Sequence, residues 1–170
     1  MKKLRIALGV QLFFFAAWGA YLLASRNTDS PEFYLETVPV DPRDLISGTY
    51  VALSYAISNP QPPACQAALA TRRTFYVKLE SRGRTAVTEQ GRAQVYEAAA
   101  CSTETPLQPG WARAEARYAF GGRSAANYGI ERFFLNENDP RKDARSGTVL
   151  AKVKIDRNRR LVLLDLVKKI

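Results

Sequence analysis

The stretch Thr148–Val167, TVLAKVKIDRNRRLVLLDLV, carries the clearest structural pattern in the chain. From Val149 to Ile155 apolar residues alternate with lysines, which is the period of a strand with one buried face and one wet face. Asn158 in the following DRNR suits a tight turn, and the apolar run from Arg160 to Val167 returns as a second arm. The stretch therefore predicts a β-hairpin that borders the core.

Similar period-2 segments, rich in aromatic and β-branched residues, recur between turn formers throughout the chain after the linker. Two short helices are also predicted, one over Gln61–Leu69 and one from Asp139, which can cap it, to Gly147, which can end it. The predicted fold is mainly β, an antiparallel barrel or a two-layer β-sandwich with one or two short helices. Strands are predicted at Phe33–Val40, Thr49–Ile57, Thr74–Glu80, Ala93–Ala99, Trp111–Phe120, Tyr128–Asn136, Thr148–Ile155 and Arg160–Val167.

The N-terminal segment from Leu4 to Ala24, LRIALGVQLFFFAAWGAYLLA, has a single charge at its edge. As a helix, Ile6 to Ala24 would rise about 28 Å, which crosses the hydrocarbon core of a bilayer. Lys2, Lys3 and Arg5 form its basic end, which is expected to stay in the cytoplasm while the rest of the chain is exported. The segment predicts one transmembrane anchor.

A cleaved signal peptide is the alternative for this segment, and it needs small residues three and one positions before the cut. Leu22 or Leu23 spoils the cuts after Ala24 or Ser25, so retention of the anchor is favoured. The predicted organisation is a basic tip and anchor over residues 1–26, a linker over 27–32 and one exported β-rich domain over 33–170.

The chain has 170 residues and a net charge of +9. Four positive charges belong to the anchor and its flanks, which leaves +5 for residues 27–170. These charges form no dense block, so nucleic acid is not expected as a partner, whereas a weak attraction to anionic lipid headgroups is. The chain has no histidine, which removes the usual general base and the commonest metal ligand.

The two cysteines, Cys65 and Cys101, fit either one disulfide in an oxidising compartment or two buried thiols. Two thiolates are too few for a zinc site. No metal, no cofactor and no catalytic residue are therefore assigned.

The densest motif is VPVDPRDLISGTYVALSY, residues 38–55. Here Gly48 allows a sharp reversal before an alternating strand. Along that strand Val51, Leu53 and Tyr55 share one face, and Tyr50 lies on the opposite face. A later segment, Tyr128 to Arg132, places Glu131 and Arg132 on opposite faces of a predicted strand, and an ion pair at the rim of the fold is favoured for them over a charge turned inward.

The segment Gly48–Tyr55 resembles the motif of the bacterial GDYXXLXY family of membrane-anchored proteins. Asp41-Pro42-Arg43 and Tyr128-Gly129-Ile130-Glu131 resemble segments that accompany this motif. The chain departs from the motif at Thr49, where the family has Asp, so the carboxylate is missing here. The resemblance marks as structural or binding residues Asp41, Pro42, Arg43, Gly48, Thr49, Tyr50, Leu53, Tyr55, Tyr128, Gly129 and Glu131.

The family has no established enzyme activity, and its members tend to be encoded beside multipass membrane proteins. The resemblance and the anchor together imply a single-pass protein of the bacterial inner membrane, with its N-terminus in the cytoplasm and its C-terminal domain in the periplasm or another extracytoplasmic space. They also imply a multipass membrane protein as partner.

Three functions are compatible with these residues. The first is a membrane-anchored binding or assembly module without catalysis. The second is an envelope hydrolase or transferase that uses carboxylate and tyrosine groups, such as Glu131 with Tyr50 or Tyr128, and the third is a small-ligand-binding barrel. A signal peptidase is disfavoured because Glu36 stands three residues before Pro39, where those enzymes have their serine nucleophile.

Overall fold

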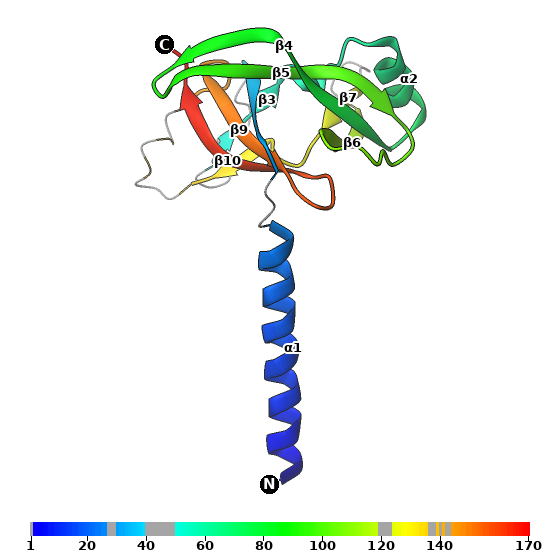
Figure 1. The fold of residues 1–170 in the computed structure, drawn as a ribbon, viewed down its shortest axis with the longest axis vertical. Helices are drawn as coiled ribbons and strands as arrows, with labels where there is room; N and C mark the ends of the chain where they lie inside the picture. The colour runs from blue at the N-terminus through cyan, green and yellow to red at the C-terminus, as the bar shows by residue number, and fades with distance from the viewer. Residues whose placement is uncertain are drawn as a thin grey trace.

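A long apolar helix precedes a domain built of strands in the computed structural model (Figure 1). The structure describes residues 2–26, 30–39, 50–118, 124–135, 139, 141 and 144–170. The elements are α1 Lys2–Arg26, β1 Glu32–Val38, β2 Tyr50–Ala52, β3 Ser54–Tyr55, the 3₁₀ turn η1 Ala56–Ser58, α2 Pro63–Thr71, β4 Thr74–Thr88, β5 Gly91–Ser102, β6 Trp111–Tyr118, β7 Ser124–Asn127, β8 Arg132–Phe134, β9 Val149–Ile155 and β10 Leu161–Lys168.

Helix α1 has 25 residues, a length of about 37 Å at 1.5 Å per residue. Its span from Lys3 to Ala24 is long and apolar enough to cross a membrane, and none of it is buried against the rest of the chain. In Figure 1 it extends away from the domain as a separate rod. The predicted helix is therefore present, with its apolar side chains uncovered.

The domain is organised around one mixed sheet of eight strands. Its strand order is β10-β9-β1-β5-β4-β6-β7, with β3 pairing on β1 at Thr37 and Val38, and β2 and β8 form a separate two-stranded sheet. Only the β1–β5 pair is parallel among the described pairs. The end strands β10 and β7 do not pair with each other in the described part of the chain, so the sheet is open and no barrel closes.

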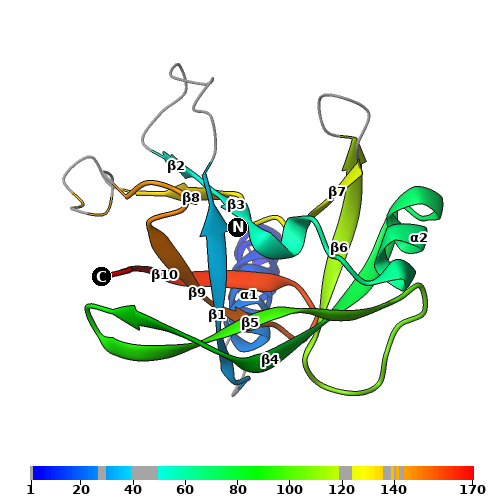
Figure 2. The same ribbon diagram turned by 90° about the horizontal axis from the view of Figure 1, so that it is seen from above.

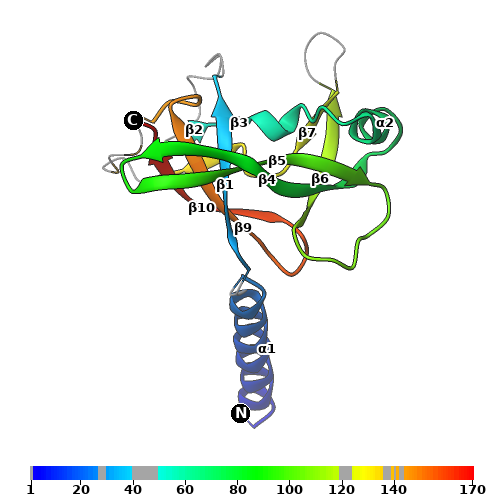
Figure 3. The same cartoon turned by 45° about the horizontal axis from the view of Figure 1, so that its top comes forward.

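The strands of this open sheet cross one another and enclose the core in a sandwich-like arrangement (Figures 2 and 3). Alternate residues of the strands point inward, as in β1, where Phe33, Leu35 and Thr37 are buried. The largest fully buried side chains include Tyr55 and Phe75. The mainly β fold predicted from period-2 alternation is thus confirmed, in its sandwich-like rather than its barrel form.

Helix α2 begins at Pro63, directly after the proline-rich stretch, as the sequence predicted. Its buried face consists of Cys65, Ala68 and Leu69. A disulfide joins Cys65 to Cys101 in β5, across 36 positions of sequence. Of the two states left open for these cysteines, the structure has the disulfide.

Several predicted strands differ from the observed ones in extent. Strand β4 runs on past Glu80 to Thr88 and pairs with the start of β5 as an exposed ribbon, from Thr85–Gln94 to Thr88–Gly91. At its other end β5 runs past Ala99 to Ser102. The prediction missed this ribbon because its side chains are mostly exposed and do not alternate. It also missed β7, whose sequence SAAN has no large apolar residue.

The predicted strand Tyr128–Asn136 is wrong over its first half. Gly129 has a φ of 81°, which breaks an extended chain, and pairing begins only at Arg132. The helix predicted from Asp139 to Gly147 includes residues outside the described ones. In its described part Ala144 N donates to Arg141 O and Thr148 N donates to Arg145 O, each at 3.0 Å.

The C-terminal hairpin predicted from Thr148–Val167 is confirmed by the antiparallel pairing of β9 and β10. Its turn closes through Asp156 N donating to Arg160 O at 2.9 Å. Positive φ falls on Arg159, at 61°, and not on Asn158. A register shift between Leu163 and Asp165 lets Leu166 and Val167 both be buried.

Removal of the disulfide should lower stability substantially. In the chain-entropy account, a bridge across 36 positions contributes about 3–4 kcal/mol by restricting the unfolded chain. We expect Cys65→Ala/Cys101→Ala to lose that amount of unfolding free energy in denaturant titrations. Reduced wild-type protein is the matched control and should lose the same amount, whereas an unchanged midpoint on reduction would contradict the expectation.

Candidate functional site

We call residues 50–55, which the structure divides into β2 and β3, the motif strand. Two buried tyrosines join it and the following turn to the segment around Gly129. The Tyr55 hydroxyl donates to Ile130 O at 2.6 Å, and the Tyr128 hydroxyl donates to Ile57 O at 2.9 Å. Both rings lie in the core, with exposures of 0% and 6%. Each segment thus supplies one tyrosine and one carbonyl, which locks β3 and η1 against residues 128–130.

The turn between these contacts depends on Gly129 and Glu131. Gly129 has positive φ, a conformation that costs glycine little. Glu131 Oε1 accepts a hydrogen bond from Tyr128 N at 2.6 Å, and Glu131 O accepts one from Leu53 N at 2.9 Å. Glu131 therefore closes its own turn and fastens it to the motif strand. Its carboxylate accepts from a backbone N–H, and the ion pair predicted at the rim is not found among the described residues.

Burial, together with the negative charge of Glu131, raises the pKa of both Tyr55 and Tyr128 far above the usual range. Burial is the larger cause, because a phenolate loses its hydration in the core. Both hydroxyls thus stay protonated and act as hydrogen-bond donors. The two hydroxyls stabilise the fold through these hydrogen bonds and are not positioned as catalytic acids or bases.

The opposite face of the motif strand is open to solvent. Tyr50, on β2, packs against Phe134 of β8 with ring centroids 5.7 Å apart, and the Arg132 guanidinium lies 5.2 Å from the Tyr50 ring. Phe134 is 72% exposed. We call Tyr50, Arg132 and Phe134 the aromatic patch; it lies on the small β2–β8 sheet, at the side of the domain away from α2 (Figure 2).

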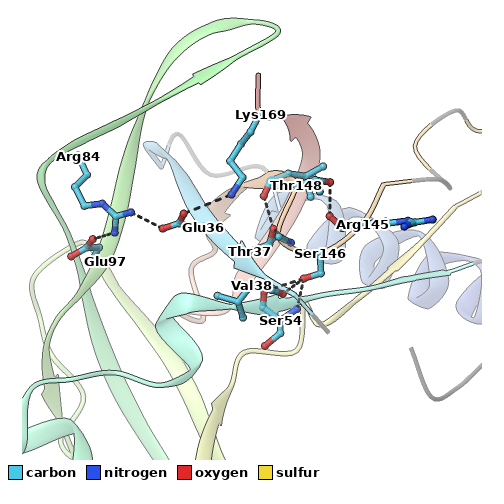
Figure 4. Close-up of polar contacts among 12 residues, drawn as sticks. Glu36, Thr37, Val38, Ser54, Arg84, Glu97, Arg145, Ser146, Thr148 and Lys169 are labelled. Carbon is cyan, nitrogen blue, oxygen red and sulfur yellow. Dashed lines mark hydrogen bonds and ion pairs between the residues drawn. The ribbon is translucent and has the colours of Figure 1, made fainter. Parts of the chain in front are cut away.

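Hydroxyl groups fasten the C-terminal end of β1 to its neighbours (Figure 4). Thr37, which is 2% exposed, donates to Val149 O at 2.5 Å and accepts from Gly147 N at 2.8 Å. Ser146 Oγ donates to Val38 O at 2.5 Å and accepts from Ser54 N at 3.1 Å. Both hydroxyls are occupied by backbone groups, so neither is placed as a nucleophile.

Gly147 is required at this junction for a steric reason. Its φ is 97°, and a Cβ built on it would lie 2.9 Å from Pro39 Cγ. Any side chain at position 147 would push the start of β9 away from the end of β1. The hydroxyl contacts of Thr37 and Ser146 depend on that close approach.

A row of charged side chains crosses the outer face of β1, β4 and β5 (Figure 4). The Arg84 guanidinium pairs with Glu97 and, at 2.8 Å, with Glu36; Lys169 Nζ lies 3.7 Å from Glu36. The hydrogen bonds to Glu97 and Glu36 raise the pKa of Arg84. An open groove of about 590 Å³ adjoins this row, lined by Arg84, Glu97 and the proline-rich stretch before α2.

The structure separates the groups named for the enzyme hypothesis. Glu131 bonds to a backbone N–H, the Tyr128 hydroxyl is engaged by Ile57 O, and Tyr50 lies on the exposed face of its strand. Within the described ranges, no group of three His, Cys, Asp or Glu residues could hold a metal ion. Glu131, Tyr128 and Tyr50 therefore do not converge on one site as an acid and a base.

The motif residues therefore divide into three groups. Leu53, Tyr55, Tyr128, Gly129 and Glu131 meet in or beside the core, and Tyr50 lies apart on the aromatic patch. Five others lie outside the described residues: Asp41, Pro42, Arg43, Gly48 and Thr49. Sequence reasoning missed Thr37, Ser146 and Arg84, because nothing in the sequence near them shows which distant strand each will meet.

Comparisons with known proteins gave a match to one protein family. A family described as "GDYXXLXY protein" matches residues 11–166. Neither the curated proteins nor the solved structures gave a match.

The Tyr55→Phe variant should be less stable than the wild type. It removes the donor to Ile130 O and leaves a buried carbonyl unpaired, which costs about 1–3 kcal/mol. Tyr50→Phe is the matched control and should leave the unfolding free energy within experimental error, because Tyr50 is only half-buried. Equal losses in denaturant titrations of the two variants would contradict the buried hydrogen bond.

The two buried tyrosines should also make stability fall in alkali. The unfolded chain loses tyrosine protons near pH 10, while folded Tyr55 and Tyr128 keep theirs to higher pH. Unfolding then releases protons above about pH 10, so stability decreases as pH rises from there. Absorbance titration should show at least two of the eight tyrosines ionising only when circular dichroism reports unfolding; their ionisation in the folded chain would contradict this.

Proposed function

This chain belongs to the GDYXXLXY family, as its motif predicted, and we propose that it is a membrane-anchored binding or assembly module. In this proposal α1 crosses the bacterial inner membrane with its basic end in the cytoplasm. The β domain lies outside the cytoplasm and docks on a multipass membrane protein. The module binds and positions its partner without catalysing a reaction.

The observation that carries the proposal is the uncovered apolar surface of α1. Its side chains from Leu4 to Leu23 are exposed in the chain by itself, including Phe13 at 76% and Leu23 at 72%. Such a surface is stable only in lipid or against another apolar helix. A membrane covers it directly, and the helices of a multipass partner offer a second cover within the bilayer.

The aromatic patch supplies a docking surface on the domain. Aromatic rings and arginine are the residue types enriched where protein partners bind most tightly. The inward half of the motif strand is committed to the core, whereas its outward half is free to contact a partner. Anchoring raises the local concentration of the patch at the membrane, so a small contact is sufficient.

The arrangement of the anchor can be tested in intact cells and spheroplasts. Full-length protein should resist alkaline extraction from membranes, and external protease should digest the β domain in spheroplasts. A domain that stays protected until the membrane is lysed would overturn the exported orientation.

The docking surface can be tested with a matched pair of variants. Phe134→Ser should reduce recovery of the partner from membranes in mild detergent by about 30-fold, the effect of losing a contact worth about 2 kcal/mol. Leu107→Ser removes an equally apolar side chain that is 98% exposed elsewhere and should leave recovery unchanged. Recovery equal to wild type in both variants would exclude the aromatic patch as the docking face.

A further inference from the structure

Arginines gather where β6 meets the turn between β9 and β10. Alternation along β6 places Arg113, Glu115 and Arg117 on one face, while Ala112 and Ala114 on the other face are buried. The turn adds further arginines beside this row. We call Arg113, Arg117, Arg157, Arg159 and Arg160 the arginine cluster.

Backbone contacts hold the two parts of the cluster together. Arg113 N donates to Arg159 O at 2.6 Å, and Arg159 Nη1 donates to Gln108 O at 2.9 Å. A surface hollow of about 340 Å³ lies between them, lined by Arg113, Arg117 and Arg160 among others. Three of the five arginines thus line a cavity, and the turn that carries the other two is held beside it.

The positive charge of this surface is not neutralised. Two acidic groups lie close by: Glu115, 3.7 Å from Arg113, and Asp156, which accepts a hydrogen bond from Arg160 N. In the described part of the chain the guanidinium groups of Arg117, Arg157 and Arg160 have no ion-pair partner, and all three residues are exposed. The cluster therefore offers free guanidinium donors around a hollow.

The topology places this cluster next to the membrane-proximal end of the domain. Glu32, at the start of β1, pairs with Lys154, two residues before the turn that begins at Asp156. Helix α1 ends at Arg26, and the chain from there to Glu32 can extend about 20 Å at most. Figure 1 agrees, because the turn between β9 and β10 lies at the end of the domain that faces α1.

We propose that the arginine cluster binds the phosphate groups of anionic phospholipids in the membrane that α1 crosses. This inference rests on the proposed anchoring. Guanidinium groups match phosphate oxygens with paired hydrogen bonds, and clustered basic residues beside a membrane are attracted to its anionic surface. The contact gives the domain a second attachment point and so fixes its orientation on the bilayer.

The test uses the full chain in nanodiscs, with a fluorophore on Asn158→Cys at the exposed tip of the turn. Both native cysteines are in the disulfide, so the new thiol is the one that reacts. Nitroxide on lipid headgroups should quench the fluorophore in discs of phosphatidylcholine with phosphatidylglycerol, and much less in phosphatidylcholine alone. Added salt should reverse the quenching, because it screens surface charge.

A matched pair of variants separates the cluster from general charge. Arg157→Gln/Arg160→Gln should reduce headgroup association about 5-fold for each arginine removed. Arg82→Gln/Arg92→Gln removes the same charge from exposed positions on β4 and β5 and should have little effect, because the β4–β5 hairpin lies on the far side of the domain from α1 (Figure 1). Equal quenching in both double variants, or in both lipid compositions, would overturn the inference while leaving the anchor intact. A chain that does not insert into nanodiscs would overturn the anchor itself, and the inference with it.

Discussion

The position of β1 determines the rest of the structure. It is the first strand after the apolar helix, and it pairs with β9, with β5 and, at Thr37 and Val38, with β3. Leu35 in its middle is fully buried. Because a strand bonded on both sides is difficult to displace, the apolar helix is joined to the domain through a strand in the middle of its sheet.

The residues of the motif strand next to β1 have two separate roles. Its inward residues complete the core next to β1, where the hydroxyls of Tyr55 and Tyr128 bridge β3 and η1 to the segment around Gly129. Its outward residue, Tyr50, is left on a surface with Phe134. Core packing of the neighbouring residues therefore fixes the position of the Tyr50 ring. The aromatic patch is held in place by the same contacts.

Much of the fold could be predicted because its strands are half-buried and alternate. The C-terminal hairpin and the inward face of Val51, Leu53 and Tyr55 follow from that period alone. The exposed ribbon of β4 and β5 could not be predicted in the same way, since backbone pairing holds it and its side chains carry no alternating signal.

The site was less predictable than the fold for a related reason. The sequence predicted a rim ion pair at Glu131 and Arg132, whereas the turn at Gly129 directs the Glu131 carboxylate back to Tyr128 N. Ser146 bridges β1 and β3 from more than 90 positions away. Contacts of this range depend on how strands are ordered in the sheet, which periodicity does not specify.

The anchor and the arginine cluster together constrain how a partner can be reached. In the proposed arrangement, a single membrane-spanning helix would limit the distance of the domain from the bilayer but leave it free to rotate about the helix axis. The proposed lipid contact at the turn between β9 and β10 would remove that rotation. The aromatic patch, on a different side of the domain, would then face along the membrane, toward the position that another membrane protein occupies. Docking would lose less orientational entropy than it would for a freely rotating domain, so weak contacts would suffice for a stable complex.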